Sequence, residues 1–439
     1  MSTALPRRDR MLDAVTQEAA LRGYEHITVA QITARAHVSL STFYQHFSDK
    51  QDCFLAAHRV LAERLADEVA LPIANEHAPA ESWGAAVRAL LQFAEREPAA
   101  FSLLTHEAIV VGARGMDERD QLIAKLEASI ERAWKLVSAG APVPDLPAKL
   151  LLGGIIRSVG IQMRRGEQHP TRMLDDFLRW AESYAVPAGQ ERRRNPMPST
   201  ELGAPPSDPP GPAPPPALPK GRHRLSAQVV AGVQRERILQ ATAEAVQVKG
   251  YAELIVADIT AAAGISREAF YTCFPDKREA FLATRNLVFE QAVAASAGAF
   301  FTASTTWPER VWDSALTFAQ FALTRPSFAH FGYVETYALG RESTAATDEG
   351  LLAFTMFLAD GYRWRAEAEH VPQLIAPAIA CAMMELCAFY VRRGRGEELY
   401  GLLPLVVYTI LAPFMGVGAA NEFIDGQISA AGTPLQVSG

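Results

Sequence analysis

The 439-residue sequence has little cysteine and no metal-binding cysteine pattern. Its four cysteines, Cys53, Cys273, Cys381 and Cys387, form no CxxC pair and have no zinc-like spacing to histidine. We expect reduced, mostly buried thiols, as in a cytoplasmic protein. The first fifteen residues have no apolar signal-peptide core, which favours the same compartment. We expect neither a metal nor another cofactor.

Motifs of common enzymes are also missing. The chain has no nucleophile elbow, no HExxH, no P-loop and no GxGxxG after a strand, and His106-Glu107 lacks a second histidine. The chain also has no excess of positive charge, because 42 Lys and Arg residues are outnumbered by 49 Asp and Glu residues and the net charge is −7. A chain coated in nucleic acid is therefore not expected, although a small basic face is compatible with DNA binding. We expect no enzymatic activity.

Alternating patterns typical of strands are absent from the chain. Apolar residues recur at helical spacing instead, for example Leu122, Leu126, Ile130 and Trp134. Two apolar runs are long enough to cross a bilayer. One is 371–391, in which Glu385 is the one charged residue, and the other is 399–420, which has no charged residue. Prolines interrupt both runs, and an apolar helix can equally be buried between protein neighbours. We expect an all-α fold and no membrane insertion.

An internal repeat dominates the sequence. Residues 23–56 and 250–283, which are 227 positions apart, are identical at 17 of 34 positions without a gap. Further along, at an offset of 228, Glu107 matches Glu335 and the Arg-Arg-Gly of 164–166 matches that of 392–394. Because the similarity extends along each half, the chain is a duplication.

A proline-rich segment separates the two copies. Residues 187–219 contain 12 of the 28 prolines and almost no large apolar side chains. Such a segment forms an extended tether with a reach of roughly 100 Å. We call residues 1–186 the first half and 220–439 the second half. The expected domains are 5–65 and 220–292 as DNA-binding domains, 75–186 and 300–420 as helical domains, and 187–219 as the linker.

The repeated segment has the features of a helix-turn-helix. Thr28 and Ser39 are N-cap residue types that precede two short helices, and Ala36-His37-Val38 is a turn of suitable length. Phe43 and Phe47 lie on one face of the second helix and are expected to anchor it. The second helix of this motif enters the major groove. Ser41, Thr42 and Gln45 are suited to contact bases, Tyr44 and His46 to contact phosphates, and Lys50 at the start of the next helix to hold another phosphate.

The string GYxxITVxxIxxxAxVSxxTFYxHFxDK resembles the N-terminal domain of tetracycline-repressor-like (TetR) regulators. The resemblance implies a three-helix DNA-binding domain followed by a helical domain that binds a small effector and forms a dimer through its last two helices. It also implies DNA contacts for Thr28, Ser39, Ser41, Thr42, Tyr44, His46 and Lys50. The family usually has glycine where this chain has His37, so we expect a modest strain at that turn.

The second copy has the better turn and the poorer recognition helix. Gly264 occupies the turn, and Ser266, Arg267, Tyr271 and Lys277 are the candidate DNA contacts. Glu268 would repel phosphate, Cys273 replaces histidine, and Ile255 replaces the capping threonine. A basic arm with Lys220, Arg222, His223, Arg224, Arg235 and Arg237 offers compensation in the minor groove. We expect DNA binding to depend more on the first copy.

The helical domains are the expected location of an effector site. The second is rich in aromatic residues, which favours a small hydrophobic or aromatic effector, although such stripes are more often core. The candidate ligand-binding residues are His106, Phe328, His330, Tyr333, Tyr337 and Phe357. We expect a repressor of double-stranded DNA in which the two halves pair within one chain, with a homodimer of chains as the other arrangement. The alternative is an interaction or sensor protein whose second helix-turn-helix no longer reads DNA.

Overall fold

The computed structural model describes residues 6–73, 79–136, 143–186, 226–302, 306–365 and 370–431, together with Leu202 and Ala368. These residues are almost entirely helical, which confirms the predicted all-α class. One short pair of antiparallel strands was not expected: β1 (Val143–Pro144) pairs with β2 (Ala185–Val186). Two residues per strand are too few to produce an alternating pattern. The proline-rich linker, apart from Leu202, lies outside the described residues.

The chain divides into two compact units that do not coincide with its two halves. Unit 1 comprises 1–196, 339–386 and 408–422, whereas unit 2 comprises 197–338, 387–407 and 423–439. Parts of the second half therefore pack with the first half in unit 1.

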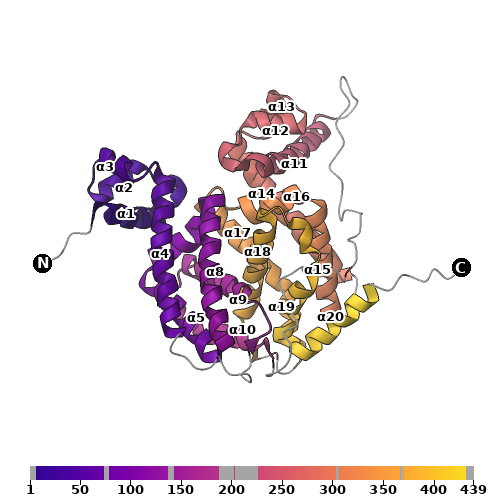
Figure 1. Ribbon diagram of the computed structural model, residues 1–439. Coiled ribbons are helices and arrows are strands. Elements are labelled where there is room, and N and C mark those ends of the chain that lie inside the picture. The colour runs from indigo at the N-terminus through magenta and orange to yellow at the C-terminus, as the bar shows by residue number, and fades with distance from the viewer. Residues whose placement is uncertain are drawn as a thin grey trace. The chain divides into compact units, whose positions relative to one another are not determined.

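Unit 1 begins with three short helices gathered around the start of a long one, and Figure 1 labels this group. The bounds are α1 (Arg7–Arg22), η1 (Tyr24–His26), α2 (Val29–Ala36), α3 (Leu40–His46) and α4 (Lys50–Ile73). Apolar residues of α1 at helical spacing, Met11, Val15 and Ala19, are completely buried against this group. Helix α4 continues without a break past the domain boundary expected at residue 65.

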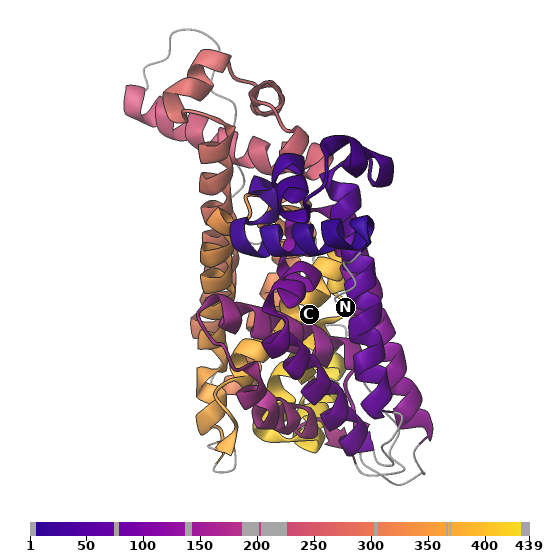
Figure 2. The ribbon, with the colours of Figure 1, turned by 90° about the vertical axis from the view of Figure 1, so that its left-hand side faces the viewer.

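The helical domain of the first half follows α4 in unit 1. Its elements are α5 (Pro79–Arg96), α6 (Pro98–Ser102), η2 (Leu103–Glu107), α7 (Ala108–Val110), α8 (Ala113–Leu136), α9 (Ala148–Arg164), η3 (Pro170–Met173) and α10 (Leu174–Glu182). Figure 2 shows α4 as a long rod with this domain beside it. The predicted row on α8, Leu122, Leu126, Ile130 and Trp134, is buried and packs toward α4 and α5.

Unit 1 is completed by segments of the second half. They are α17 (Arg341–Ala353), η5 (Phe354–Arg363), the first part of α18 (Ile375–Arg392), the last part of α19 (Leu403–Met415) and the start of α20 (Val417–Ala431). The Tyr184 hydroxyl donates to the Thr409 carbonyl oxygen at 2.7 Å. A Cβ on Gly154 of α9 would lie 2.8 Å from the Ala378 carbonyl oxygen of α18, so only glycine permits this close approach.

Unit 2 contains the second DNA-binding segment and the core of the second helical domain. Its elements are α11 (Ala227–Glu253), α12 (Val256–Ala263), α13 (Arg267–Cys273), α14 (Lys277–Thr302), α15 (Trp307–Thr324), α16 (Pro326–His330), η4 (Phe331–Glu335), the rest of α18 and α19, η7 (Gly396–Leu399) and most of α20 (Val417–Ala431). Gly250 breaks α11 with a φ of 72°, at the position matching Gly23. Helix α14 passes the expected boundary at 292, and α20 extends beyond the expected domain end at 420.

One described helix, α18, is long and apolar enough to cross a membrane by length and composition. Buried core helices pass the same test, and most of α18 is buried. The single acidic residue of α18, Glu385, forms ion pairs with two arginines of the first half. These contacts are those of a core helix.

Candidate nucleic-acid interface

Two capped helices build the first helix-turn-helix. The Thr28 hydroxyl accepts the Gln31 backbone N–H at 3.3 Å, and the Gln31 side chain accepts the Thr28 N–H at 2.8 Å, which together form a capping box on α2. The Ser39 hydroxyl accepts the Thr42 N–H at 3.1 Å and so caps α3. Thr28 and Ser39 are therefore in place as caps, whatever contact they make with DNA.

The turn between α2 and α3 is sharp because His37 adopts a left-handed conformation, with φ 52° and ψ 49°. Among the described residues it is the one non-glycine with positive φ, so the expected strain lies where the sequence places it. Phe43 and Phe47 are buried and pack at a ring-centroid distance of 5.6 Å. Both rings hold α3 on the core as expected.

The outward face of α3 carries the predicted recognition residues. Ser41, Tyr44, Gln45 and His46 are exposed, and 59% of the Tyr44 surface is accessible. Thr42 is half-buried, and its hydroxyl lies 2.9 Å from that of Ser39. These side chains offer donors and acceptors on one rigid helix, which is the arrangement that base and phosphate contacts need.

Lys50 has a role that its position in the sequence does not reveal. Its ammonium donates to the carbonyl oxygens of Tyr24 and Ile27, each at 3.1 Å, and lies 4.5 Å from the centroid of the Tyr24 ring. Burial lowers the pKa of Lys50, while the Glu25 carboxylate raises it. The lysine ties η1 to the start of α4, so a phosphate contact would be an additional role.

The second helix-turn-helix has the same frame with weaker capping. Gly264 turns with φ 62°, and the Ser266 hydroxyl accepts the Ala269 N–H at 3.1 Å. Lys277 donates to the carbonyl oxygens of Tyr251 and Leu254 at 3.2 and 2.8 Å, as Lys50 does in the first copy. Ile255 has no side-chain acceptor for α12, so of the two side-chain bonds in the first copy's capping box this copy has the one from the Ile255 N–H to the Asp258 carboxylate.

The basic residues of the second copy are partly engaged within the protein. A guanidinium nitrogen of Arg267 lies 3.4 Å from the Tyr271 hydroxyl, and both side chains are exposed beside Glu268. Arg237 donates to the Ala263 carbonyl oxygen at 2.6 Å, and Arg235 lies over the Phe274 ring. The other residues of the predicted basic arm, at 220–224, lie outside the described part of the chain.

A repeated π-helical turn joins each DNA-binding segment to its helical domain. In η2 the Glu107 carboxylate accepts the Tyr24 N–H at 2.7 Å, and in η4 the Glu335 carboxylate accepts the Tyr251 N–H at 3.1 Å. Burial is the main cause that raises the pKa of Glu107 to about 7 and raises that of Glu335. The sequence shows that these two glutamates occupy equivalent positions, but no role was predicted for them. The signal that could have revealed the role is a carboxylate that both copies keep within an apolar helix.

One contact ties the first DNA-binding segment to the second half within unit 1. The Glu25 carboxylate accepts the backbone N–H of Arg341 at 2.9 Å, and the Arg341 guanidinium donates to the Ala20 carbonyl oxygen. A carboxylate at the first residue of α17 also suits the helix dipole. The position matching Glu25 in the second copy is Ala252. Because alanine has no carboxylate, the second copy cannot form the equivalent hydrogen bond.

The predicted ligand-binding residues are spread over both units. Phe328 and Tyr337 are buried, and His330 and Tyr333 are half-buried, all in unit 2, whereas buried Phe357 belongs to unit 1. His106 is buried in unit 1 with its Nε2 3.2 Å from the Thr344 hydroxyl. Burial lowers the pKa of His106 well below its ordinary value, so the ring is neutral at pH 7.

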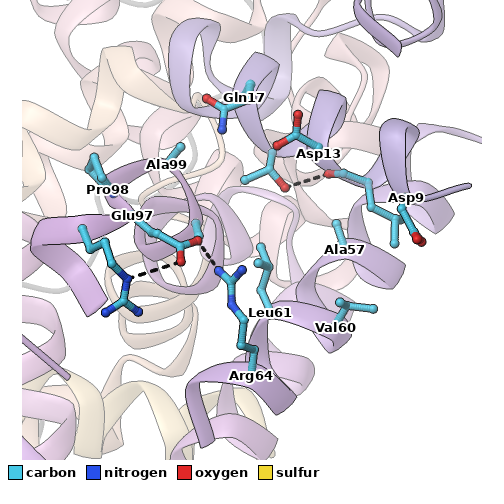
Figure 3. A pocket seen from close by; sticks show the side chains of 14 residues that line it. Asp9, Asp13, Gln17, Ala57, Val60, Leu61, Arg64, Glu97, Pro98 and Ala99 are labelled. Carbon is cyan, nitrogen blue, oxygen red and sulfur yellow. Dashed lines mark hydrogen bonds and ion pairs between the residues drawn. The ribbon is translucent and has the colours of Figure 1, made fainter. Parts of the chain in front are cut away.

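A groove of about 370 Å³ lies between α1, α4 and the α5–α6 junction. Figure 3 shows its lining, in which Glu97 forms ion pairs with Arg64 and Arg96 beside Asp9 and Asp13. None of the predicted ligand-binding residues lines it. The groove has a mixed polar and apolar lining and lies where the first helix-turn-helix segment meets its helical domain.

Comparison with known proteins matches both helix-turn-helices. The model of the family described as bacterial regulatory proteins, tetR family, matches residues 11–57 and again 238–284. The nucleoid occlusion factor SlmA of Photobacterium profundum is 25% identical over 179 residues, which are 39% of this chain and 91% of that protein. The SlmA protein of Pectobacterium carotovorum subsp. carotovorum is 26% identical over 136 residues, 30% and 69% respectively.

Two solved structures are also similar over part of the chain. The fatty acid degradation regulator FadR from Bacillus halodurans aligns with a TM-score of 0.35 and 15% identity, over 41% of this chain and 96% of that one. A TetR family transcription regulator from Marinobacter aquaeolei VT8 aligns with a TM-score of 0.32 and 19% identity, over 39% and 94%. Each spans less than half of the present chain.

Proposed function

Because the chain is a tandem member of the tetR family of bacterial regulatory proteins, we propose that it is a cytoplasmic transcriptional repressor that a small apolar effector releases from its operator. The observation that carries the proposal is the exposed face of α3. Tyr44, Gln45 and His46 stand on a helix that is capped by Ser39 and anchored by Phe43. A rigid, outward helix of this kind reads the major groove.

The first helix-turn-helix is the stronger DNA-binding element in this proposal. Its recognition helix carries no acidic residue, whereas Glu268 is exposed on α13. Lys50 and Lys277 make the same backbone contacts, so they do not distinguish the copies. A comparison of Lys50→Ala with Lys277→Ala would test folding as much as DNA binding.

Two tyrosines provide a matched test. Tyr44 and Tyr271 occupy equivalent positions, are exposed, and pack edge-on against Phe43 and Phe270. Operator fragments are first captured from genomic DNA with the full chain. Tyr44→Phe is then expected to weaken operator binding at least about tenfold, the value of one hydrogen bond to a charged phosphate. Tyr271→Phe is expected to leave binding nearly unchanged, and a larger loss from it would reverse the ranking.

The effector is proposed to bind among aromatic residues of the second half. The support is their density: the Phe321 and Phe328 rings lie 6.4 Å apart, as do those of Phe318 and Tyr333. Thermal-shift screening of the full chain against apolar aromatic compounds identifies ligands, and each is then tested for release of operator DNA. Ligands that stabilise the chain but release no DNA would argue against this part of the proposal.

In a second candidate function, the second copy keeps the helix-turn-helix fold but does not read DNA. The specific observations are Glu268 on the recognition helix, the uncapped start of α12 at Ile255, and Arg267 beside Tyr271. In that case the second copy serves as a sensor or interaction domain. Capture of genomic DNA that is weakened by Tyr44→Phe and insensitive to every α13 variant would favour this function.

The two halves are proposed to pair with each other in one chain. Hydrogen bonds from Tyr184 to Thr409 and from Arg164 to Asp348 support this, since each joins residues of different halves inside unit 1. A tether gives the partner half an effective concentration on the order of millimolar. Light scattering at low micromolar concentration is expected to give the mass of one chain. A stable two-chain mass would contradict pairing within the chain.

A further inference from the structure

Helix α18 has one acidic side chain, Glu385, and the first half neutralises it. The Arg119 guanidinium on α8 donates to Glu385 Oε2 at 2.6 Å, and Arg157 on α9 donates to Oε1. The side chains of Glu385, Arg119 and Arg157 are 12%, 6% and 7% exposed, respectively. All three residues belong to unit 1, although Glu385 lies 266 and 228 positions from its partners.

The two arginines keep Glu385 ionised in an apolar environment. Burial raises the pKa of Glu385, but the charges of Arg119 and Arg157 outweigh burial and hold the pKa below its ordinary value. A charge that is nearly excluded from water needs such partners, since an unpaired one would be strongly unfavourable.

Arg157 and Glu385 occupy equivalent positions in the duplicated sequence. Residues 164–166 match 392–394 at an offset of 228, and the same offset places residue 157 on 385. A Cβ on Gly153 would lie 3.1 Å from Glu385 Cγ, so α9 and α18 approach closely at this level. Equivalent residues that touch each other mark the axis about which the two halves are paired.

With this register, pairs of like halves and pairs of unlike halves differ in the charges that they bring together. A pair of two first halves would bring Arg157 against a second Arg157, and a pair of two second halves would bring Glu385 against a second Glu385. Both combinations bury like charges next to each other, which weakens binding and disfavours the wrong partner. Only a first half with a second half places opposite charges together.

We propose that Arg157 and Glu385, supported by Arg119, form a charge code that makes each half select the other half and reject its own copy. The proposal rests on the pairing of the halves proposed above. It identifies the preferred partner of each half from its buried charges. The first half contributes two cations and the second half contributes one anion. The code acts on partner choice, because a buried ion pair is weak support for stability but can fix register and specificity.

A neighbouring ion pair provides a matched control. Arg164 donates to Asp348 at 2.7 Å and also joins the two halves. The equivalent residues are Arg392 and Asp120, so both members of this pair are the same in the two copies. Replacing all four residues with Met removes these charges from both copies alike, so like and unlike pairs lose the same charges.

The first test measures partner choice directly. A protease site is placed in 187–219, the folded chain is cleaved, and the fragments are denatured in urea, refolded together and weighed by native mass spectrometry. The unaltered chain is expected to give only the one-to-one pair of unlike fragments. Arg119→Met/Arg157→Met/Glu385→Met is expected to give at least about a tenth of like pairs, whereas Asp120→Met/Arg164→Met/Asp348→Met/Arg392→Met gives none.

The outcomes separate the two claims. Like pairs from the unaltered chain would overturn pairing between the halves itself. Strictly unlike pairs from the triple methionine variant would overturn the charge code and leave pairing intact.

The second test uses the intact chain and does not require refolded fragments. Arg119→Met/Glu385→Arg sets a second guanidinium against Arg157, and it is expected to lower the unfolding temperature because two buried like charges then face each other. Adding Arg157→Glu restores opposite charges and is expected to bring the unfolding temperature back toward that of the unaltered chain. If the added Arg157→Glu brings no recovery, the charge code is wrong.

Discussion

His37 and Gly264 are the turn residues of two otherwise matching motifs. Both adopt the left-handed conformation, with φ of 52° and 62°. Glycine adopts this conformation freely, whereas a side chain costs about 1 kcal/mol there. The first copy therefore carries a small local strain that the second copy lacks.

Exchanging the turn residues tests this difference. His37→Gly is expected to stabilise α2 and α3 by about 1 kcal/mol, and Gly264→His to destabilise α12 and α13 by a similar amount. Hydrogen exchange of the buried α2 amides is expected to slow about fivefold in His37→Gly, the factor that matches this energy. Exchange that is unchanged or faster would mean that His37 is not strained.

Residue types alone predict much of the local frame of the first helix-turn-helix, but not the contacts of Lys50. The caps Thr28 and Ser39 and the anchor Phe43 follow from local spacing, because their partners lie within four residues. The partners of Lys50 are the carbonyl oxygens of Tyr24 and Ile27, more than twenty residues earlier. No periodic pattern in the sequence predicts that Lys50 contacts this turn. Because Lys50 begins a helix, the sequence alone therefore favours its interpretation as a phosphate ligand.

At the scale of elements, the π-helical turn η2 is the joint between DNA-binding segment and helical domain. Its Glu107 is held between the Tyr24 N–H and charged neighbours that include Glu25, Arg341 and Arg164. Because the pKa of Glu107 is raised by burial to about 7, the folded chain binds more protons than the unfolded chain between pH 4.5 and 7. The free energy of unfolding therefore falls as pH rises through this window.

Glu107→Gln removes that titration and keeps an oxygen for the Tyr24 N–H. Thermal unfolding of both proteins is measured across the range from about pH 5 to 8. The stability of the variant relative to the unaltered chain is expected to rise with pH by up to about 3 kcal/mol. Buried His58, whose pKa burial lowers to about 4, titrates in the opposite sense but cancels in the difference. A difference independent of pH would contradict this role of Glu107.

Helical periodicity predicts the long elements better than their ends. The buried row on α8 lies where the sequence places it, since a 3.6-residue apolar repeat is strong over ten or more residues. The strands β1 and β2 and the end of α20 were not predicted. Two-residue strands have no period, and α20 continues past the apolar run that set the expected boundary.

At the scale of the whole molecule, the duplication predicts two halves but not the division into units. Segments 339–386 and 408–422 of the second half pack with the first half. The sequence marks Glu385 as a lone charge in an apolar run, but its arginine partners lie more than two hundred residues earlier. Only the folded chain brings these positions together.

The central claim is that one chain binds DNA with two unlike helix-turn-helices. The most direct test is selection of the full chain on random double-stranded DNA, followed by sequencing of the bound fraction. The expected result is an asymmetric site with two unlike half-sites about 34–36 Å apart or a multiple of it, because α3 and α13 differ in sequence. A palindromic site would contradict the claim in favour of paired first halves from two chains, and no enriched sequence would contradict DNA reading itself.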